Sequence, residues 1–274
     1  MTVPTAATRW REDLARWAIP DEILEKAPES PWHFPVKLFA SRADAAQDAA
    51  PTPSNVRAME ALPKGGSVLD VGCGAGAASL ALASQASQLV GVDTSREMLD
   101  AFAQRASAAG VEAKAIEGSW PDVAERTPPT DVVVCHHVFY NAPDLGTFAA
   151  RLTDHARRRV VVEMTVDHPL SNLNPLWLRF HDLTRPTRPT ADDAVAVLRE
   201  AGLSPERQDW EAPRPGGFET RAELVAMVRR LLCLPADRDP EIDEALGDRP
   251  VDRHGRWGFP DRPVTTIWWP GTAA

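Results

Sequence analysis

The feature that most constrains the fold is a short apolar run that ends in a cluster of glycines. Residues 67–76 read SVLDVGCGAG, and an alanine-rich segment, residues 77–85, follows. A brief apolar run bounded by turn residues is typical of a buried strand, and glycines let the backbone turn sharply and approach a ligand closely. The sequence therefore predicts a strand, a glycine turn and a helix that begins at the carboxyl edge of a sheet, where open α/β sheets bind ligands.

The alternation of strands and helices continues along the chain. Strands are predicted at 67–71, 88–92, 111–117, 131–135, 159–164, 208–212 and 264–269. Helices are predicted at 8–25 with a break at Pro20, 36–49, 55–62, 77–85, 95–109, 190–202 and 222–234. Strands that alternate with helices at this spacing predict an α/β fold with a doubly wound, mostly parallel, seven-stranded sheet.

The 25 prolines are concentrated outside this periodic core. We predict a helical and aromatic cap over residues 1–50 and a core domain over 51–274, with a lid insertion at 166–190 and a helical insertion at 216–262. The β-rich segment at 264–269 must return to the sheet after the helical insertion. This part of the chain is therefore expected to form one domain.

Charge and cysteine content exclude some classes of function. A net charge of −9 opposes the basic surface expected of a protein that binds bare nucleic acid. The run Arg157 to Arg159 is interpreted as a solvated loop before a strand. The three cysteines lack metal-ligand spacing, so no metal site is expected. Their odd number and the lack of a signal peptide favour a cytoplasmic location, and no apolar run has the roughly 18 to 20 residues of a membrane span.

An acidic residue followed by GxGxG resembles motif I of the class I S-adenosylmethionine-dependent methyltransferases. The resemblance covers about residues 65–163. It implies this enzyme class, with S-adenosyl-L-methionine as cofactor and S-adenosyl-L-homocysteine as product. In the family the acid contacts the methionine end of the cofactor, directly or through water, and the glycine backbone lines it. The matching residues here are Asp70, Gly72, Cys73, Gly74 and Gly76.

The same glycines also satisfy the G-x-G-x-x-A pattern of dinucleotide-binding folds, with Asp93 at the spacing of a ribose-binding acid. In that interpretation Asp70 would face the pyrophosphate of NAD, which is an electrostatic mismatch. The same carboxylate suits a cationic α-amino group. The sequence therefore favours the methyltransferase, and a NAD-dependent dehydrogenase is the remote alternative.

Two further segments match the family at the nucleoside end of the cofactor. The resemblance assigns the ribose hydroxyls to Asp93 and the adenine to Thr94 and Met98; Asp93 can also cap the helix that follows it. At the adenine edge many relatives carry an acid where this chain has Ser119. Next to it, Trp120 either stacks on the base or packs in the core.

The segment from Asp131 to Asp144 is similar to motif IV of small-molecule and quinone-type relatives and lacks the Asn-Pro-Pro-Tyr pattern used on bases. Cys135 and His136 are expected to border the methionine portion of the cofactor. His136 and His137 are candidate general bases, because histidine titrates in the right range, or have structural roles. Tyr140 either lines the pocket or packs in the core.

The acceptor is the least constrained part of the prediction. The predicted lid contains an aromatic stretch from His168 to His181, and the N-terminal cap holds another at residues 32–34. These aromatics form an apolar acceptor pocket, or they only attach loose cover to the core. We predict methyl transfer to a small, aromatic or hydrophobic acceptor. The alternatives are a methyltransferase that acts on a protein or RNA, and a catalytically silent protein that binds S-adenosylmethionine.

Overall fold

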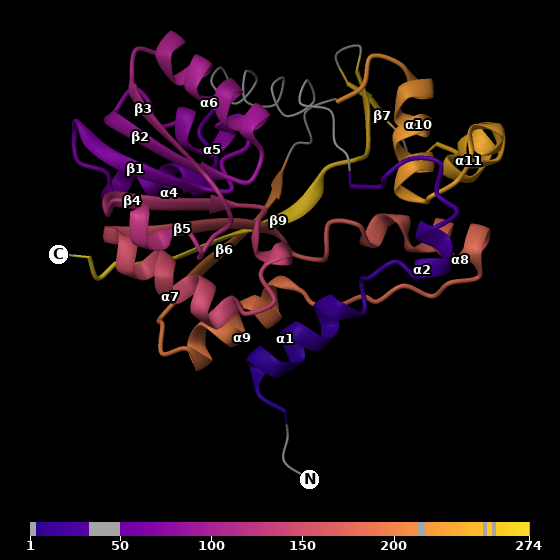
Figure 1. Ribbon diagram of the computed structural model, residues 1–274, viewed down its shortest axis with the longest axis horizontal. Helices are drawn as coiled ribbons and strands as arrows, with labels where there is room; N and C mark the ends of the chain where they lie inside the picture. Colours follow the sequence, from indigo (N-terminus) through magenta and orange to yellow (C-terminus); the bar gives the residue numbers. More distant parts are fainter. Residues whose placement is uncertain (1–3, 33–49, 213–216, 249–250, 254–255, 274) are drawn as a thin grey trace.

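The computed structural model describes residues 4–32, 50–212, 217–248, 251–253 and 256–273. Its centre is a seven-stranded sheet in the order β3-β2-β1-β4-β5-β9-β6 (Figure 1). The strands are β1 (Gly66–Val71), β2 (Ala86–Asp93), β3 (Glu112–Glu117), β4 (Thr130–His136), β5 (Ala156–Thr165), β6 (Glu206–Ala212) and β9 (Arg262–Pro270). Neighbours among β1 to β5 pair in parallel, whereas β9 is antiparallel to both β5 and β6. The predicted fold class is confirmed.

Two layers of helices cover the sheet because its central strands are apolar on both faces. One face packs against α4 (Pro53–Ala61), α5 (Ala77–Leu80) and α6 (Arg96–Ala108), and the other against α7 (Leu145–His155). Beside α7 lies α9 (Ala191–Glu200), and α1 (Ala6–Ala15) packs against both helices (Figure 1). Alternate residues of each strand supply the two cores; in β1, Val68 faces one and Leu69 the other.

Several helices differ from the predictions. The predicted helix at 77–85 ends at Leu80, and the chain continues in turns with i to i+3 hydrogen bonds because β2 must begin at Ala86. Helix α4 begins two residues earlier than predicted, and its cap is Thr52, which forms a capping box with Asn55. Helix α7 was not predicted, although Asp144 caps it. The predicted helix at 36–49 lies outside the described residues.

A group of short helices lies beside the sheet, at the right of Figure 1. It consists of α2 (Asp21–Leu24), α8 (Asn174–His181), α10 (Arg221–Leu231) and α11 (Asp239–Leu246). They share a third apolar cluster, in which Trp177 and Ile242 are buried. A hairpin of β7 (Val251–Arg253) and β8 (Arg256–Gly258), which was not predicted, lies near α10. Among the described helices, none has the length and apolar character needed to cross a membrane.

Candidate active site

The parallel strands β1, β2, β4 and β5 end at one edge of the sheet, and the residues predicted to be functional gather there. The first group is the glycine loop, residues 72–76, between β1 and α5. Gly72 and Gly74 have φ angles of 72° and 51°, a region that favours glycine. A Cβ on Gly72 would come within 2.3 Å of the Val138 side chain, whereas a Cβ on Gly74 would meet nothing within 4 Å. The loop is therefore packed on its inner side and open at Gly74.

Asp93 holds this loop in place from the end of β2. Its Oδ2 accepts a hydrogen bond from the Gly74 N–H at 2.8 Å, and its Oδ1 accepts one from the Ser95 N–H at 2.9 Å. The cap of α6 is Ser95, whose hydroxyl accepts from the Met98 N–H. A carboxylate has about four acceptor positions, so Asp93 keeps capacity for further donors such as ribose hydroxyls.

Asp70 lies inside the strand–turn–helix unit, with only 1% of its surface exposed. Its Oδ2 accepts from the Ser79 hydroxyl at 2.6 Å and from the Ser79 N–H at 3.2 Å. Burial raises the pKa of Asp70 to about 6, although the hydrogen bonds from Ser79 and the nearby His136 act in the opposite direction. The structure thus places Asp70 behind the loop, where its partner is α5.

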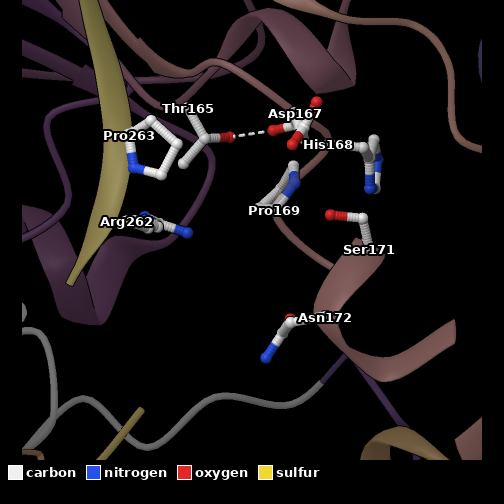
Figure 2. A pocket seen from close by; sticks show the side chains of 8 residues that line it. All are labelled: Thr165, Asp167, His168, Pro169, Ser171, Asn172, Arg262 and Pro263. Atoms are coloured by element: carbon white, nitrogen blue, oxygen red, sulfur yellow. Dashed lines mark hydrogen bonds between the residues drawn. The ribbon is translucent and has the colours of Figure 1, made fainter. Parts of the chain in front are cut away.

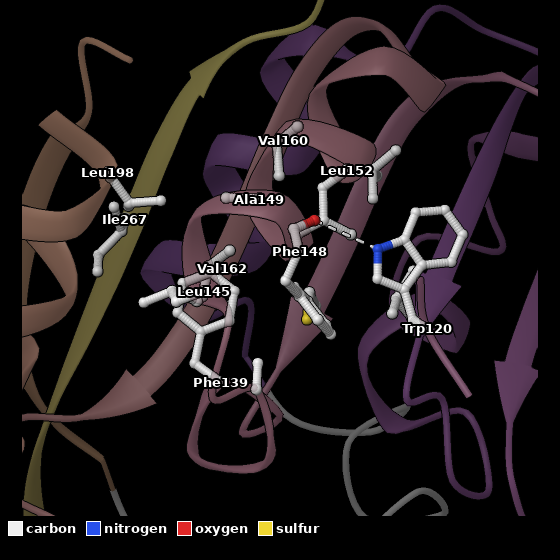
Figure 3. Close-up of a cluster of buried hydrophobic side chains, with 14 of the residues drawn as sticks. Trp120, Phe139, Leu145, Phe148, Ala149, Leu152, Val160, Val162, Leu198 and Ile267 are labelled. Atoms are coloured by element: carbon white, nitrogen blue, oxygen red, sulfur yellow. Dashed lines mark hydrogen bonds between the residues drawn. The ribbon is translucent and has the colours of Figure 1, made fainter. Parts of the chain in front are cut away.

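The predicted adenine contacts divide into exposed and buried residues. Thr94 and Ser119 are exposed and Met98 is buried. The Trp120 side chain lies in the core, and its indole N–H donates to the Phe148 carbonyl at 3.3 Å (Figure 3). This packing against α7 favours the alternative in which Trp120 belongs to the core.

Cys135 is expected to border the methionine portion of the cofactor, and its surroundings are apolar. It is fully buried in the core cluster that contains Phe139, and burial raises the pKa of its thiol well above the usual value. The reason is the alternation along β4, which turns Cys135 into the sheet packing and leaves the next residue, His136, near the edge. Cys73, Cys135 and Cys233 are all free thiols. In the described part of the chain, no group of three potential metal ligands occurs.

His136 and His137 lie against a glutamate that the sequence analysis did not single out. Glu163 in β5 contacts His137 Nε2 through Oε1 at 3.2 Å, and its Oε2 lies 3.9 Å from His136 Nδ1. Burial opposes ionisation of Glu163, but His136 and His137 together hold its pKa at about 2. Burial lowers the pKa of His136. The ring nitrogen His136 Nε2 is buried and has no hydrogen-bond partner among the described residues.

Tyr140 is held by the end of β5. Its hydroxyl donates to the Thr165 carbonyl at 2.9 Å and contacts the Thr165 hydroxyl. Burial raises the pKa of Tyr140. The prediction of Tyr140 as a catalytic residue is not supported by this arrangement, because its hydroxyl is already engaged and resists ionisation. Its ring packs edge-on against His168 at 5.3 Å.

A pocket of about 240 Å³ opens beside this cluster (Figure 2). Thr165, which ends β5, lies on its wall only two residues after Glu163, so the pocket and the histidine cluster share one edge of the sheet. Arg262 projects into the pocket from the start of β9. The lining residues are Thr165, Asp167, His168, Pro169, Ser171, Asn172, Arg262 and Pro263.

The N-terminal segment braces one wall of the pocket. Trp17 stacks on His168 with ring centroids 3.6 Å apart, and burial lowers the pKa of His168 to about 3. Arg185 donates to the carbonyl oxygens of Trp17 and Ala18. Trp17 and His168 thus support the wall of the pocket, which His168 itself lines. Of the N-terminal aromatics at 32–34, Trp32 is exposed and the other two lie outside the described residues.

Glu163 and Arg262 are the functional candidates that the sequence analysis missed. Glu163 could have been found, since it is an acid within the apolar run VVVEM. A charge inside a buried strand requires a partner. Arg262 carries no comparable signal, because it lies in a proline-rich stretch whose position depends on the pairing of β9.

Residues 68–159 match a protein-family model described as a methyltransferase domain. The strand order of the sheet agrees with the class I methyltransferase fold, because β9 is inserted antiparallel between β5 and β6. The dinucleotide-binding fold has instead the strand order 3-2-1-4-5-6. The chain therefore has the class I methyltransferase fold and carries a methyltransferase domain, whose cofactor is S-adenosylmethionine.

The chain is also similar to individual proteins. It is 35% identical over 81 residues to a ubiquinone biosynthesis O-methyltransferase from Aliivibrio fischeri strain MJ11 and spans about a third of the length of that relative. Among solved structures it is similar to a cyclopropane-fatty-acyl-phospholipid synthase-like protein from Lactobacillus casei, with a TM-score of 0.54 and 16% identity over 91% of this chain and 98% of that one. It is similar to YcgJ from Bacillus subtilis, with a TM-score of 0.51 and 19% identity over 81% and 98%. These structures show the fold alone.

The residues at the sheet edge fit the cofactor. The open position at Gly74 leaves room for a ligand against the loop. Asp93 supplies carboxylate acceptors for neighbouring hydroxyls, and His136 Nε2 is a buried polar atom that lacks a partner among the described residues. A nucleoside with a charged amino-acid tail needs such acceptors and such close approach to backbone. We therefore expect the glycine loop and Asp93 to hold it.

Proposed function

We propose that this protein transfers a methyl group from S-adenosylmethionine to a small molecule bound in the pocket between Thr165 and Arg262. The observation that carries the proposal is that the pocket opens at the same edge of the sheet as the glycine loop and Asp93. The similarity to a ubiquinone biosynthesis O-methyltransferase supports a small acceptor. The pocket volume of about 240 Å³ is also small.

When bound, the cofactor supplies a methyl group that is already activated. The residues of this chain then have to orient the acceptor, exclude water and take up a proton. Orientation matters because reacting atoms must approach within about 3 to 3.5 Å in line. The glycine loop and Asp93 would hold the cofactor, and the pocket would hold the acceptor.

His137 is the proposed proton acceptor. Its Nε2 lies 3.2 Å from Glu163, so an N–H at this nitrogen donates to the carboxylate and leaves Nδ1 free to take a proton. Glu163 would then act as a positioning residue that sets the tautomer of the ring. His137 is also more exposed than His136, with 39% of its side chain accessible against 15%. Exposure allows an acceptor to reach it.

The proposal is tested by calorimetric titration with S-adenosylhomocysteine and with NADH. We expect the first to bind and the second not to bind. In a turnover assay that measures S-adenosylhomocysteine release across a set of small phenols, His137→Ala should lower the rate and leave the affinity for S-adenosylhomocysteine unchanged. No binding of S-adenosylhomocysteine at millimolar concentration would refute the proposed function. A normal rate in His137→Ala would assign this histidine a structural role.

A further inference from the structure

Arg262 is a partly buried cation that has no partner among the described residues. It begins β9, and its guanidinium projects into the pocket (Figure 2). Within the part of the chain that the structure describes, its side chain forms no hydrogen bond and no ion pair within 4.0 Å. Other arginines of the same region are engaged: Arg207 in β6 pairs with Asp192 and Asp209. Arg262 therefore stands out as a cation whose counterion is not supplied by the described fold.

An unpaired guanidinium in a partly buried place is costly, because it has lost water without gaining a partner. Burial lowers the pKa of Arg262, while the more distant Tyr140 and Glu163 act in the other direction. Glu163 does not meet the need, because its two oxygens face His137 and His136. A ligand with an anionic group would relieve this cost.

The rest of the pocket favours a singly charged, planar anion. The side chains of Ser171 and Asn172 line the same space and form no hydrogen bonds with other described residues, so they add donors. His168 carries no charge at neutral pH, since burial holds its pKa at about 3. Asp167 adds a negative charge at an exposed position of the rim. One cation with a nearby carboxylate suits a carboxylate ligand better than a phosphate dianion, and the guanidinium fork matches a carboxylate in two parallel hydrogen bonds.

We infer that the acceptor is a small carboxylate-bearing molecule whose carboxylate is bound by Arg262, with Ser171 and Asn172 as further donors. The inference rests on the proposed function, because it takes this pocket as the acceptor site. Thr165 and Glu163 point to the same face of β5, two residues apart. A ligand anchored at Arg262 therefore extends along this face toward His137. The carboxylate is the anchor, and the methyl-accepting atom lies at the other end.

The test uses three probes that share a ring: benzoate, its neutral analogue benzamide, and phenyl phosphate. Each is titrated calorimetrically into the full chain, with and without S-adenosylhomocysteine. We expect benzoate to bind more tightly than the other two. Arg262→Gln should weaken benzoate binding roughly tenfold to a hundredfold, the usual worth of hydrogen bonds to a charged group. Benzamide binding should not change, and Arg262→Lys should fall between.

Arg207→Gln is the matched control, since it removes a guanidinium from the neighbouring strand but outside the pocket. It should leave benzoate binding unchanged. Equal binding of benzoate and benzamide, no benzoate binding, or an unchanged affinity in Arg262→Gln would overturn the inference. Preference for phenyl phosphate would overturn the carboxylate assignment. If S-adenosylhomocysteine does not bind while benzoate binds through Arg262, the anion site stands and the proposed function fails.

Discussion

The glycine loop and the acceptor pocket share one edge of the sheet but are built in different ways. At the glycine loop the groups are backbone atoms, and the carboxylate that organises them is 19 residues away in the sequence. At the pocket the groups are side chains, which come from the end of β5, the following segment and the start of β9. The first depends on local backbone geometry and the second on tertiary pairing. Changes at the loop should therefore affect every ligand that includes the cofactor's nucleoside, and changes at the pocket only the choice of acceptor.

The largest effect on ligand affinity is expected for Gly74→Val in the glycine loop. Valine at a φ of 51° is strained, and its side chain would fill the space that is open above the loop. We expect the affinity for S-adenosylhomocysteine to fall at least a hundredfold, measured by calorimetry, while benzoate still binds in the pocket.

Gly110→Val is the matched control for this variant. Gly110 has a φ of 70°, and a Cβ added to it would meet nothing within 4 Å, but it lies at the end of α6 away from the loop. Both variants should lose similar thermal stability, and only Gly74→Val should lose ligand affinity. If the two variants bind S-adenosylhomocysteine equally well, the loop is not the binding surface.

The next prediction concerns Glu163, beside the pocket, and the pH dependence of the free energy of unfolding. Glu163 has a pKa of about 2 in the folded protein, held below the value of 4.5 by the two histidines against the effect of burial. It therefore stabilises the fold above pH 4.5, and this stabilisation is lost as the pH falls from 4.5 towards 2. Glu163→Gln should lower the free energy of unfolding above pH 4.5 and change it little near pH 2.

Chemical denaturation at a series of pH values measures this difference. Glu117→Gln is a control for the loss of one negative charge from the sheet, since Glu117 is exposed at the end of β3. A difference between wild type and Glu163→Gln that stays constant from pH 7 to pH 2 would contradict the assigned ion pairing.

The smallest effect on ligand affinity is expected for Asp93, which holds the loop. Asp93→Ala removes the acceptor of the Gly74 N–H and the Ser95 N–H, as well as the proposed ribose contact. We expect the affinity for S-adenosylhomocysteine to fall roughly tenfold, equivalent to about 1 to 2 kcal/mol. Asp100→Ala, which changes an exposed acid on α6, should have no effect. Unchanged affinity in Asp93→Ala would remove this residue from the site.

The sequence was sufficient to predict the elements whose signals are local. Apolar runs such as DVVVC predict a strand, here β4, and Ser95 and Thr190 mark the starts of α6 and α9. The side-chain direction was less accessible, because a strand pattern that is apolar on both faces does not tell which way Cys135 points. Trp120 presented the same difficulty, since only the packing of α7 shows that its ring is covered.

The pocket could not be predicted because it depends on register. Arg262 meets the end of β5 only through the antiparallel pairing of β9, in which Val264 lies opposite Thr165. A shift of one residue would turn the side chains of β9 to the other face. Glu163 is different, because an acid inside an apolar run can be recognised in the sequence. Its partners, His136 and His137, lie at the end of the neighbouring strand β4.

The stacking of Trp17 on His168 has a consequence for how such a protein changes over time. The indole N–H of Trp17 also donates to the carbonyl of Arg188, so the start of the chain is fastened to both ends of the segment that follows β5. A substitution near residue 17 can tilt the imidazole and reshape the cavity while the strands and the nucleoside end stay as they are. Homologues with altered N-terminal helices would then be the first place to look for new acceptor preferences.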